Sequence, residues 1–252
     1  MSTLAIVQAR MTSTRFPGKV LAPLVGQTMV LRQLERVRRA TTLDGVIVAT
    51  STDPTDDELT GVVEASGVPV VRGSLDDVLD RFITAMDVFE PEVVVRLTAD
   101  CPLISPFVID QVVEAFRASN ADYVSNTMTP TYPDGLDVEV VRASVLREVA
   151  RSATDPPERE HVTLGVYRRH DRYRVENVIG SRDLSHLRWT VDTPADFAFV
   201  TRVYEALLPV TADFDLEDVL AYLEQHPEFS RTDADAARNA ALTGLDTGAM
   251  NA

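Results

Sequence analysis

The chain has 252 residues, of which 45% are hydrophobic and 25% are charged, as in an ordinary folded globular protein. This composition argues against disordered, collagen-like and coiled-coil classes. Asp and Glu number 39 against 24 Lys and Arg, which gives a net charge of -15 at pH 7. Such a surface repels nucleic acid and anionic lipid, so we expect neither as a partner, whereas a small anionic substrate needs only a local group of cations.

The single cysteine, Cys101, excludes an internal disulfide and a cysteine-clustered zinc site, and it fits a reducing compartment. No apolar run approaches the roughly 18 residues of a membrane span. Residues 1–10 also lack the basic and apolar regions of a secretion signal. We therefore expect a cytoplasmic protein that does not contact membranes.

Short β-branched runs alternate with amphipathic segments from the first residues onward. Four of these runs are predominantly apolar and do not alternate, which is typical of strands buried on both faces. They are residues 4–7, 45–49, 69–71 and 92–97. The alternation predicts an α/β fold with a doubly wound, mostly parallel sheet that is covered by helices on both faces.

The first predicted helix lies within residues 28–40. Val30, Leu34 and Val37 recur there at helical spacing and form its apolar face. We expect the charged side chains of this segment, Arg36 among them, to face the solvent.

Two later helices begin at recognisable caps. Ser105 is followed by a proline, which is favoured at the first helical position. Thr193 is followed by Pro194 and then by Asp196, which is the pattern of a capping box. This second signal predicts a helix that continues to about Leu207.

The alternation breaks between about residues 126 and 180. Residues 129–135 are rich in turn formers, and residues 136–141 alternate as in a half-solvated antiparallel strand. We expect this stretch to form a small antiparallel arm or subdomain of a single domain at 1–227. The polar, alanine-rich residues 228–252 are expected to be a weak helix or a disordered tail.

The loop after the first strand is the strongest candidate for a phosphate-binding site. It carries three cations and three hydroxyls between Arg10 and Lys19. Backbone N–H groups of such a loop bind anionic oxygens, and Arg and Lys add charge-assisted bonds. Ser13 and Val20 exclude a Walker A loop, and the absence of a Gly-x-Gly pair excludes the dinucleotide fingerprint. The alternative is a solvated basic turn.

Two carboxylates are candidate metal ligands. Asp100 follows the most apolar strand, at the edge of the sheet where ligands bind, and magnesium prefers one or two carboxylates together with substrate phosphates. Asp192 precedes a helix cap, where the helix dipole alone stabilises an anion. The alternative for Asp100 is a structural role in the turn before Cys101. The four histidines are scattered and indicate neither a zinc site nor a catalytic triad.

The string IVQARMTSTRFPGKVL at residues 6–21 resembles the N-terminal signature of the sugar cytidylyltransferases, in particular the spore coat polysaccharide biosynthesis protein F group. The 3-deoxy-manno-octulosonate and acylneuraminate cytidylyltransferases are more distant relatives of that group. The similarity extends through further motifs at residues 71–82, 94–104, 132–140, 157–163 and 187–197. It implies a nucleotide-diphospho-sugar transferase sheet with a dimerisation and acceptor-binding arm.

The resemblance also implies a reaction: CMP moves from CTP to an acidic sugar, pyrophosphate is released, Mg²⁺ is the cofactor, and the enzyme is a homodimer. The triphosphate loop matches Arg10, Ser13, Arg15 and Lys19, of which Arg15 and Lys19 are catalytic together with Asp100. The magnesium ligands match Asp100 and Asp192. The segment near the nucleotide contains Arg72, Gly73, Asp77 and Asp80. The acceptor-side motifs contain Tyr132, Asp134, Glu139, Arg159, Glu160 and His161.

The acceptor stays open at this point. Cys101 stands where the octulosonate enzymes have glutamate, and Arg96 stands where they are uncharged, which argues against octulosonate itself. Arg96, Arg159 and Arg168 are candidate cations for another acidic acceptor. The alternatives are a phosphonate acceptor, a glycosyltransferase and a non-catalytic nucleotide-binding protein. A glycosyltransferase would favour an Asp-x-Asp motif, and residues 98–100 offer a single carboxylate.

Overall fold

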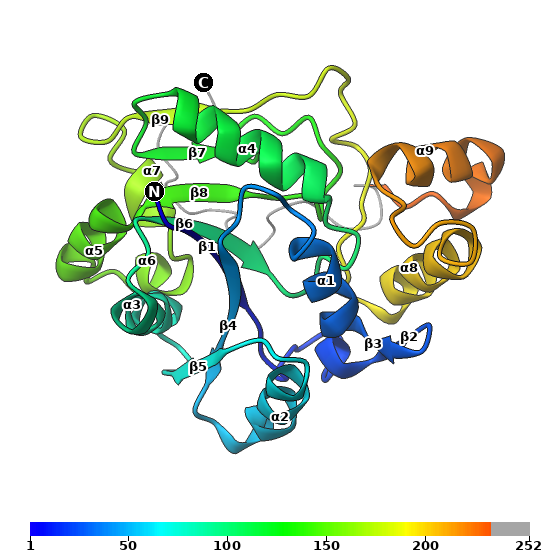
Figure 1. The fold of residues 1–252 in the computed structure, drawn as a ribbon, viewed down its shortest axis with the longest axis horizontal. Coiled ribbons are helices and arrows are strands. Elements are labelled where there is room, and N and C mark those ends of the chain that lie inside the picture. Colours follow the sequence, from blue (N-terminus) through cyan, green and yellow to red (C-terminus); the bar gives the residue numbers. More distant parts are fainter. Residues whose placement is uncertain (233–252) are drawn as a thin grey trace.

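Residues 1–232 are described here from a computed structural model, and residues 233–252, most of the expected tail, lie outside the described part. A seven-stranded sheet in the order β5-β4-β1-β6-β8-β7-β9 crosses the molecule (Figure 1). Of these strands only β8 runs antiparallel to its neighbours, so the prediction of a mostly parallel α/β sheet is confirmed. The strands are β1 (Thr3–Gln8), β4 (Gly45–Ser51), β5 (Val70–Gly73), β6 (Val93–Thr98), β7 (Tyr123–Ser125), β8 (Glu139–Arg142) and β9 (Val175–Asn177).

Helices cover both faces of the sheet (Figure 1). Ala5 and Val7 of β1 pack with α1, α2, α4, α8 and α9 on one face, and Ile6 packs with α3, α5 and α7 on the other, because successive side chains of a strand point to opposite faces. None of the helices within residues 1–232 has the length and apolar character to cross a membrane. The helices are α1 (Met29–Val37), α2 (Asp57–Ala65), α3 (Val78–Phe89), α4 (Pro106–Ala118), α5 (Ala143–Ser152), α6 (Pro156–Glu160), α7 (Leu164–Tyr167), α8 (Pro194–Leu207) and α9 (Leu216–Gln225).

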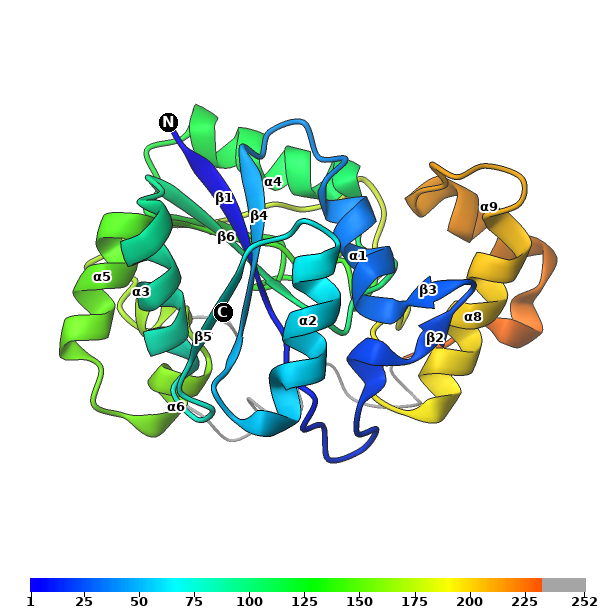
Figure 2. The ribbon, with the colours of Figure 1, turned by 60° about the horizontal axis from the view of Figure 1, so that its bottom comes forward.

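The parallel strands bring their carboxyl ends to one edge of the sheet. Gln8, the last residue of β1, pairs with Thr98 at the end of β6 and with Ala49 of β4. The three strands lie side by side in Figure 2. The loops that follow β1 and β6 therefore leave the sheet at the same level, as the sequence predicted for a ligand-binding edge.

The segment between residues 126 and 180 differs from the expected arm. Its strand β8 is antiparallel, as predicted, but it is inserted between β6 and β7 of the main sheet. Residues 139–141 of β8 are buried rather than half-solvated, because α4 and α5 both contact this strand. A separate antiparallel sheet of two strands is formed instead by β2 (Pro23–Leu24) and β3 (Gln27–Thr28), beside α1 and α8 (Figure 2).

The side chain of Arg36 on α1 is buried, contrary to the expectation that it faces solvent. Its guanidinium donates hydrogen bonds to the carbonyl oxygens of Ile104 at 2.7 Å and Phe214 at 2.9 Å, and it lies 3.3 Å from the Asp215 carboxylate. The turn before α4 supplies Ile104, and the segment that leads into α9 supplies Phe214 and Asp215, so both segments cover the polar face of α1. The helical periodicity of α1 does not reveal that other segments pack on its polar face.

Candidate active site

A cavity of about 390 Å³ opens at the carboxyl ends of β1 and β6. Its walls come from the loop after β1, the turn after β6, the first turn of α3, the end of α6 and the residue before the α8 cap. Within the described residues the polar side chains that line it are Gln8, Arg10, Ser13, Thr14, Arg15, Lys19, Arg81, Thr98, Asp100, Glu160, His161 and Asp192. The cavity thus brings together the expected phosphate loop and both expected metal ligands.

The loop after β1 is folded tightly enough to direct its cations to one side. The backbone N–H groups of Ser13 and Gly18 both donate to the Met11 carbonyl oxygen, at 3.0 and 2.9 Å. Gly18 has φ of 73°, in the left-handed region that glycine adopts without strain. The Met11 N–H donates to the Asp56 carboxylate at 2.7 Å, which fastens the loop to the neighbouring segment. Lys19 then begins a short 3₁₀ helix with its side chain turned inward.

The ammonium of Lys19 lies between the two carboxylates of the cavity. Its Nζ lies 3.3 Å from Asp100 Oδ2 and 3.1 Å from Asp192 Oδ1, and it donates to the Val191 carbonyl oxygen at 2.7 Å. Burial disfavours the charged ammonium, but the two carboxylates outweigh burial and raise the pKa of Lys19 above its ordinary value. The ammonium therefore stays charged and holds the two carboxylates close together.

Asp100 is positioned by its own turn. Thr98 Oγ1 donates to Asp100 Oδ1 at 2.6 Å, while Oδ2 faces Lys19. Burial raises the pKa of Asp100, and Lys19 and the Thr98 hydroxyl lower it by more, so the net shift is downward. Asp100 is thus an ionised carboxylate at neutral pH.

Asp192 is surrounded by three cations. Lys19 contacts its Oδ1, while Arg15 at 3.0 Å and Arg188 at 2.6 Å contact Oδ2. The predicted capping box of α8 forms directly after it, with Asp196 accepting from the backbone N–H of Asp192 at 3.1 Å. The cap and Arg188 together fix the direction of the carboxylate.

The donor set of this cavity fits a hard divalent cation. No cluster of three or more His, Cys, Asp or Glu that would form an all-protein metal cage was found in residues 1–232. Asp100 and Asp192 are held within reach of one ammonium, and cations line the same cavity beside them. Mg²⁺ is usually bound by one or two carboxylates with phosphate oxygens completing its shell, which is the chemistry this pair offers.

Arg81 lines the cavity but was missed by the sequence analysis. Its side chain is buried on α3 and donates to the carbonyl oxygens of Ser74 and Leu75. A Cβ at Gly73 would lie 2.9 Å from Arg81 Cγ, so glycine at this position allows the close approach. Burial, together with the neighbouring Arg10, lowers the pKa of Arg81. The available signal was an arginine three residues after Val78 and four before Ala85, on the apolar face of the helix.

Other residues assigned to the nucleotide lie outside this cavity. Arg72 forms an ion pair with Asp57 at 2.7 Å and donates to the Ser51 carbonyl oxygen at 2.8 Å. Asp77 is the N-cap of α3 and accepts from Arg159 Nε at 2.7 Å. Asp80 is exposed and lines, with Arg159, a separate cavity between α3 and α5.

Arg96, which was expected to bind the acceptor, is paired within the protein. It lies opposite Glu139 in the antiparallel register of β6 and β8 and forms an ion pair with it. Glu139 also accepts from Tyr123 Oη and Thr163 Oγ1, each at 2.6 Å, and is buried. Gln8, which lines the cavity, accepts from Arg96 Nε at 3.1 Å. The ion pair therefore lies behind the cavity wall.

The remaining acceptor-side residues divide into two groups. Glu160 and His161 line the cavity, and burial lowers the pKa of His161, which favours the neutral imidazole at neutral pH. Tyr132 is buried and its hydroxyl donates to Gln111 at 3.0 Å. Asp134 is buried and forms an ion pair with Arg188 at 2.8 Å.

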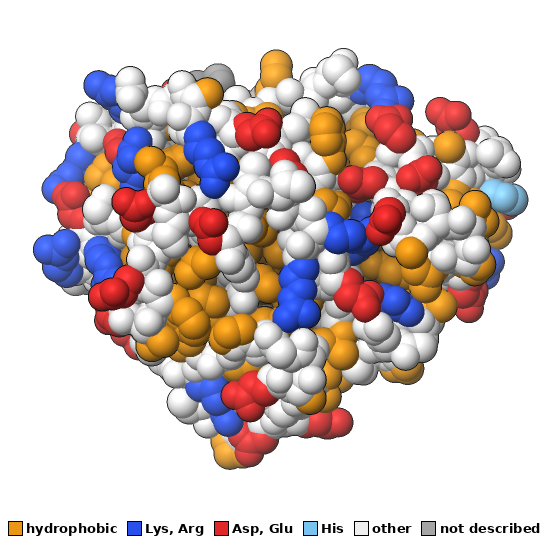
Figure 3. Space-filling model, viewed as in Figure 1, with side chains coloured by type: hydrophobic (Ala, Val, Ile, Leu, Met, Phe, Trp, Pro, Cys, Tyr) orange, Lys and Arg blue, Asp and Glu red, His pale blue; other side chains and the backbone are white. Residues whose placement is uncertain are grey.

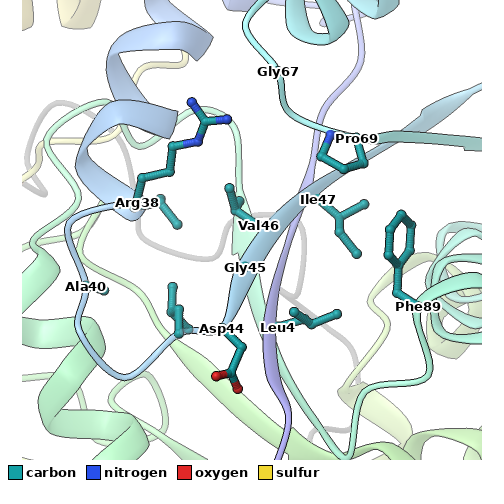
Figure 4. Close-up of a pocket in the computed structure, with 12 residues that line it drawn as sticks. Leu4, Arg38, Ala40, Asp44, Gly45, Val46, Ile47, Gly67, Pro69 and Phe89 are labelled. Atoms are coloured by element: carbon teal, nitrogen blue, oxygen red, sulfur yellow. The ribbon is translucent and has the colours of Figure 1, made fainter.

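A second cavity, of about 450 Å³, lies at the amino ends of β4 and β5. Hydrophobic side chains gather over these strands in Figure 3, and Leu4, Ile47 and Phe89 line the cavity in Figure 4. Among the described lining residues the charged ones are Arg38 and Asp44. Arg38 donates a hydrogen bond to the Ser66 carbonyl oxygen, and Asp44 accepts one from the Thr3 N–H. This cavity offers no paired carboxylates.

The fold and the first cavity define the class: an α/β protein with cations and two carboxylates at the carboxyl edge of its sheet. The model of the cytidylyltransferase family matches residues 4–225. The chain therefore belongs to the cytidylyltransferase family of enzymes, which confirms the resemblance found in its motifs.

Individual relatives agree with this assignment. Spore coat polysaccharide biosynthesis protein SpsF of Bacillus subtilis is 33% identical over 232 residues, 89% of this chain and 95% of the relative. An 8-amino-3,8-dideoxy-manno-octulosonate cytidylyltransferase of Shewanella amazonensis is 34% identical over 133 residues, 51% of this chain and 53% of the relative. A cytidylyltransferase structure from Leptospira borgpetersenii has a TM-score of 0.86 at 29% identity, covering 91% of this chain and 96% of that one.

Proposed function

We propose that the chain transfers CMP from CTP to an acidic sugar in a magnesium-dependent reaction, in the synthesis of a surface polysaccharide or another glycoconjugate. The observation that carries this proposal is the Lys19 ammonium between Asp100 and Asp192, in one cavity with Arg10 and Arg15. Family membership supports the transfer of a cytidylyl group. The name of the octulosonate relative supports an acidic sugar as acceptor, and the name of the spore coat relative supports a role in polysaccharide synthesis.

The proposed reaction is an in-line displacement at the α-phosphorus of CTP. A bond forms from the acceptor hydroxyl oxygen to the α-phosphorus, the bond to the pyrophosphate oxygen breaks, and the hydroxyl proton passes to water. Such chemistry depends on positioning and charge neutralisation. Arg10, Ser13 and the loop N–H groups orient the triphosphate, while Arg15 and Lys19 neutralise the leaving pyrophosphate.

Asp100 and Asp192 are the residues that would hold Mg²⁺. When bound there, the ion supplies neutralisation of phosphate charge and lowers the pKa of the attacking hydroxyl. Lys19 and Arg15 pair with the same carboxylates without nucleotide, so both cations must turn toward the phosphates when CTP binds. Thr98 and Arg188 keep their hydrogen bonds to the carboxylates throughout.

We assign direct acceptor contact to Glu160 and His161, since both line the cavity. A neutral imidazole and a carboxylate both accept hydrogen bonds from sugar hydroxyls. We assign Arg96, Tyr132, Asp134, Glu139 and Arg159 to the support of the cavity wall, because each forms hydrogen bonds or ion pairs with other residues of the protein. Arg72, Gly73, Asp77 and Asp80 remain proposed residues of the nucleotide side.

We also propose a cytoplasmic homodimer. The free, buried Cys101 supports a reducing compartment, and the resemblance of the sequence motifs to the sugar cytidylyltransferases is the support for the dimer. A sharply monomeric mass at micromolar concentration would exclude the dimer.

Pyrophosphate release with Mg²⁺, measured for each of the four ribonucleoside triphosphates against a panel of acidic sugars and phosphonates, tests the proposal. We expect release with CTP and an acidic sugar. Release only with a phosphonate would change the acceptor class. Tight, magnesium-independent CTP binding without release would favour a non-catalytic nucleotide-binding protein.

A further inference from the structure

The turn that carries Asp100 is held by a side chain from a different element. Gln33 lies on α1 and is fully buried. Its amide Nε2 donates to the Thr98 carbonyl oxygen at 2.7 Å, and its Oε1 accepts from the Cys101 N–H at 3.3 Å. One amide therefore joins the two ends of the turn on which Asp100 stands.

A second bond acts on the carboxylate itself. Thr98 Oγ1 donates to Asp100 Oδ1 at 2.6 Å, and Thr98 is the residue whose carbonyl Gln33 binds. The chain of contacts runs from α1 through Gln33 to Thr98 and then to Asp100. It leaves Oδ2 directed toward Lys19 at 3.3 Å.

We infer that Gln33 and Thr98 are the positioning residues of Asp100 and set the affinity of the active site for its divalent cation. The inference rests on the proposed function, in which Asp100 is a metal ligand. Hydrogen-bond partners of a ligating carboxylate typically contribute 10- to 100-fold to metal affinity or activity. Both residues are neutral, so their replacement by apolar residues of similar shape alters the orientation of Asp100 without changing the charge of the cavity.

Asn126 supplies a matched control. It is also a fully buried amide that bridges two backbone groups, with Nδ2 donating to the Leu136 carbonyl oxygen at 2.8 Å and Oδ1 accepting from the Val138 N–H at 2.9 Å. It does not line the cavity. Loss of this amide destabilises the fold by the same kind of defect, and neither of its two hydrogen bonds is to a residue of the Asp100 turn.

The experiment measures Mn²⁺ affinity by electron paramagnetic resonance of the unbound ion, in the presence of CTP. Wild type is compared with Gln33→Met, Thr98→Val, Thr98→Ser and Asn126→Leu. Thermal unfolding and CTP affinity in EDTA are measured for each protein. We expect Mn²⁺ binding about tenfold weaker or more in Gln33→Met and Thr98→Val, and the Mg²⁺ concentration for half-maximal rate should rise in parallel. Thr98→Ser keeps the hydroxyl and should retain wild-type affinity.

The outcomes distinguish the positioning role of Gln33 and Thr98 from a purely structural role, and they distinguish failure of this inference from failure of the proposed function. Wild-type Mn²⁺ affinity in a folded Gln33→Met or Thr98→Val protein would overturn it, as would equal weakening in Asn126→Leu. If Gln33→Met does not fold, the comparison of Thr98→Val with Thr98→Ser still tests the inference. Thr98→Val removes the hydrogen bond to Asp100, and Thr98→Ser keeps it. Failure of the wild type itself to bind Mn²⁺ with CTP would instead refute the proposed metal dependence, and the inference with it.

Discussion

Lys19 is the only lysine in a sequence that contains 23 arginines. An ammonium is a compact point charge, whereas a guanidinium is a planar fork that needs partners in its plane. In this cavity one Nζ meets Asp100, Asp192 and the Val191 carbonyl oxygen, all within 3.3 Å. Three acceptors around one nitrogen atom suit an ammonium better than a planar guanidinium.

Charge alone should therefore be insufficient at this position. We expect Lys19→Arg to lower kcat on the order of 10²-fold, as the loss of one preorganised charge stabiliser does, with the positive charge retained. Arg15→Lys, at a half-exposed side chain, should have a smaller effect. Pyrophosphate release measures both, and wild-type turnover in Lys19→Arg would contradict the role of Lys19.

In the proposed function, Lys19 also competes with the metal for Asp100 and Asp192. Because its ammonium already pairs with Asp100 and Asp192, a divalent cation must displace it unless the phosphates of CTP draw it away. We expect Lys19→Met to bind Mn²⁺ without nucleotide at least about tenfold more tightly than wild type, since each 1.4 kcal/mol of removed competition is a tenfold change. Calorimetry without CTP checks this, and unchanged affinity would show that the ion pair does not restrain the carboxylates.

The ion pair sets a pH window for stability. The pKa of Lys19 is raised, so its contribution is present below about pH 10.5 and is lost as pH rises through the folded value. The pKa of Asp100 is lowered, so its contribution is present above about pH 3.9 and is lost as pH falls through the folded value. The difference in unfolding free energy between wild type and Lys19→Met should be flat from pH 5 to about 9 and shrink outside that window.

Selective ¹⁵N labelling of lysine gives a single side-chain ammonium signal from this chain, since Lys19 is its only lysine. That signal should titrate above the ordinary value of 10.5. A midpoint below 10.5 would mean that burial outweighs the two carboxylates.

At the scale of elements, the site was predictable where it depends on parallel strands. Lys19 and Asp100 follow β1 and β6, which lie in register, so their loops had to meet. Arg96 and Glu139 were not predictable as partners, because their pairing depends on the insertion of β8 beside β6. Gln33 had no recognisable signal, since its role depends on how α1 packs under a turn 68 residues away.

The contact between Arg36 on α1 and the segment before α9 gives a prediction about stability. Arg36→Met removes a buried guanidinium, leaves the Ile104 and Phe214 carbonyl oxygens without this donor, and takes the cation from Asp215, which keeps its hydrogen bond from Ser105. We expect a loss of about 3 kcal/mol in the free energy of unfolding. The exposed pair of Arg39 and Asp213 should contribute less than about 1 kcal/mol. Urea unfolding of Arg36→Met and Arg39→Met measures the difference, and equal losses would contradict the assigned role of Arg36.

At the scale of the whole molecule, function is concentrated at one edge of the sheet. The chain has a net charge of -15, yet Arg10, Arg15, Lys19 and Arg81 line one cavity. In the proposed function, this local concentration of cations is what allows an acidic protein to bind the triphosphate of CTP. The cavity at the opposite edge is mainly apolar (Figure 4). Its charged side chains, Arg38 and Asp44, already form hydrogen bonds within the protein.

The most direct test follows the α-phosphate of CTP. In a single turnover with Mg²⁺ and the acidic sugar that supports pyrophosphate release, label placed at the α-phosphate should appear in the sugar product, and label at the γ-phosphate should appear in pyrophosphate. The same reaction with Asp100→Asn or Asp192→Asn should lose most of the product while the fold is kept. Transfer of the γ-label to the sugar, or full activity in both carboxylate variants, would contradict the account.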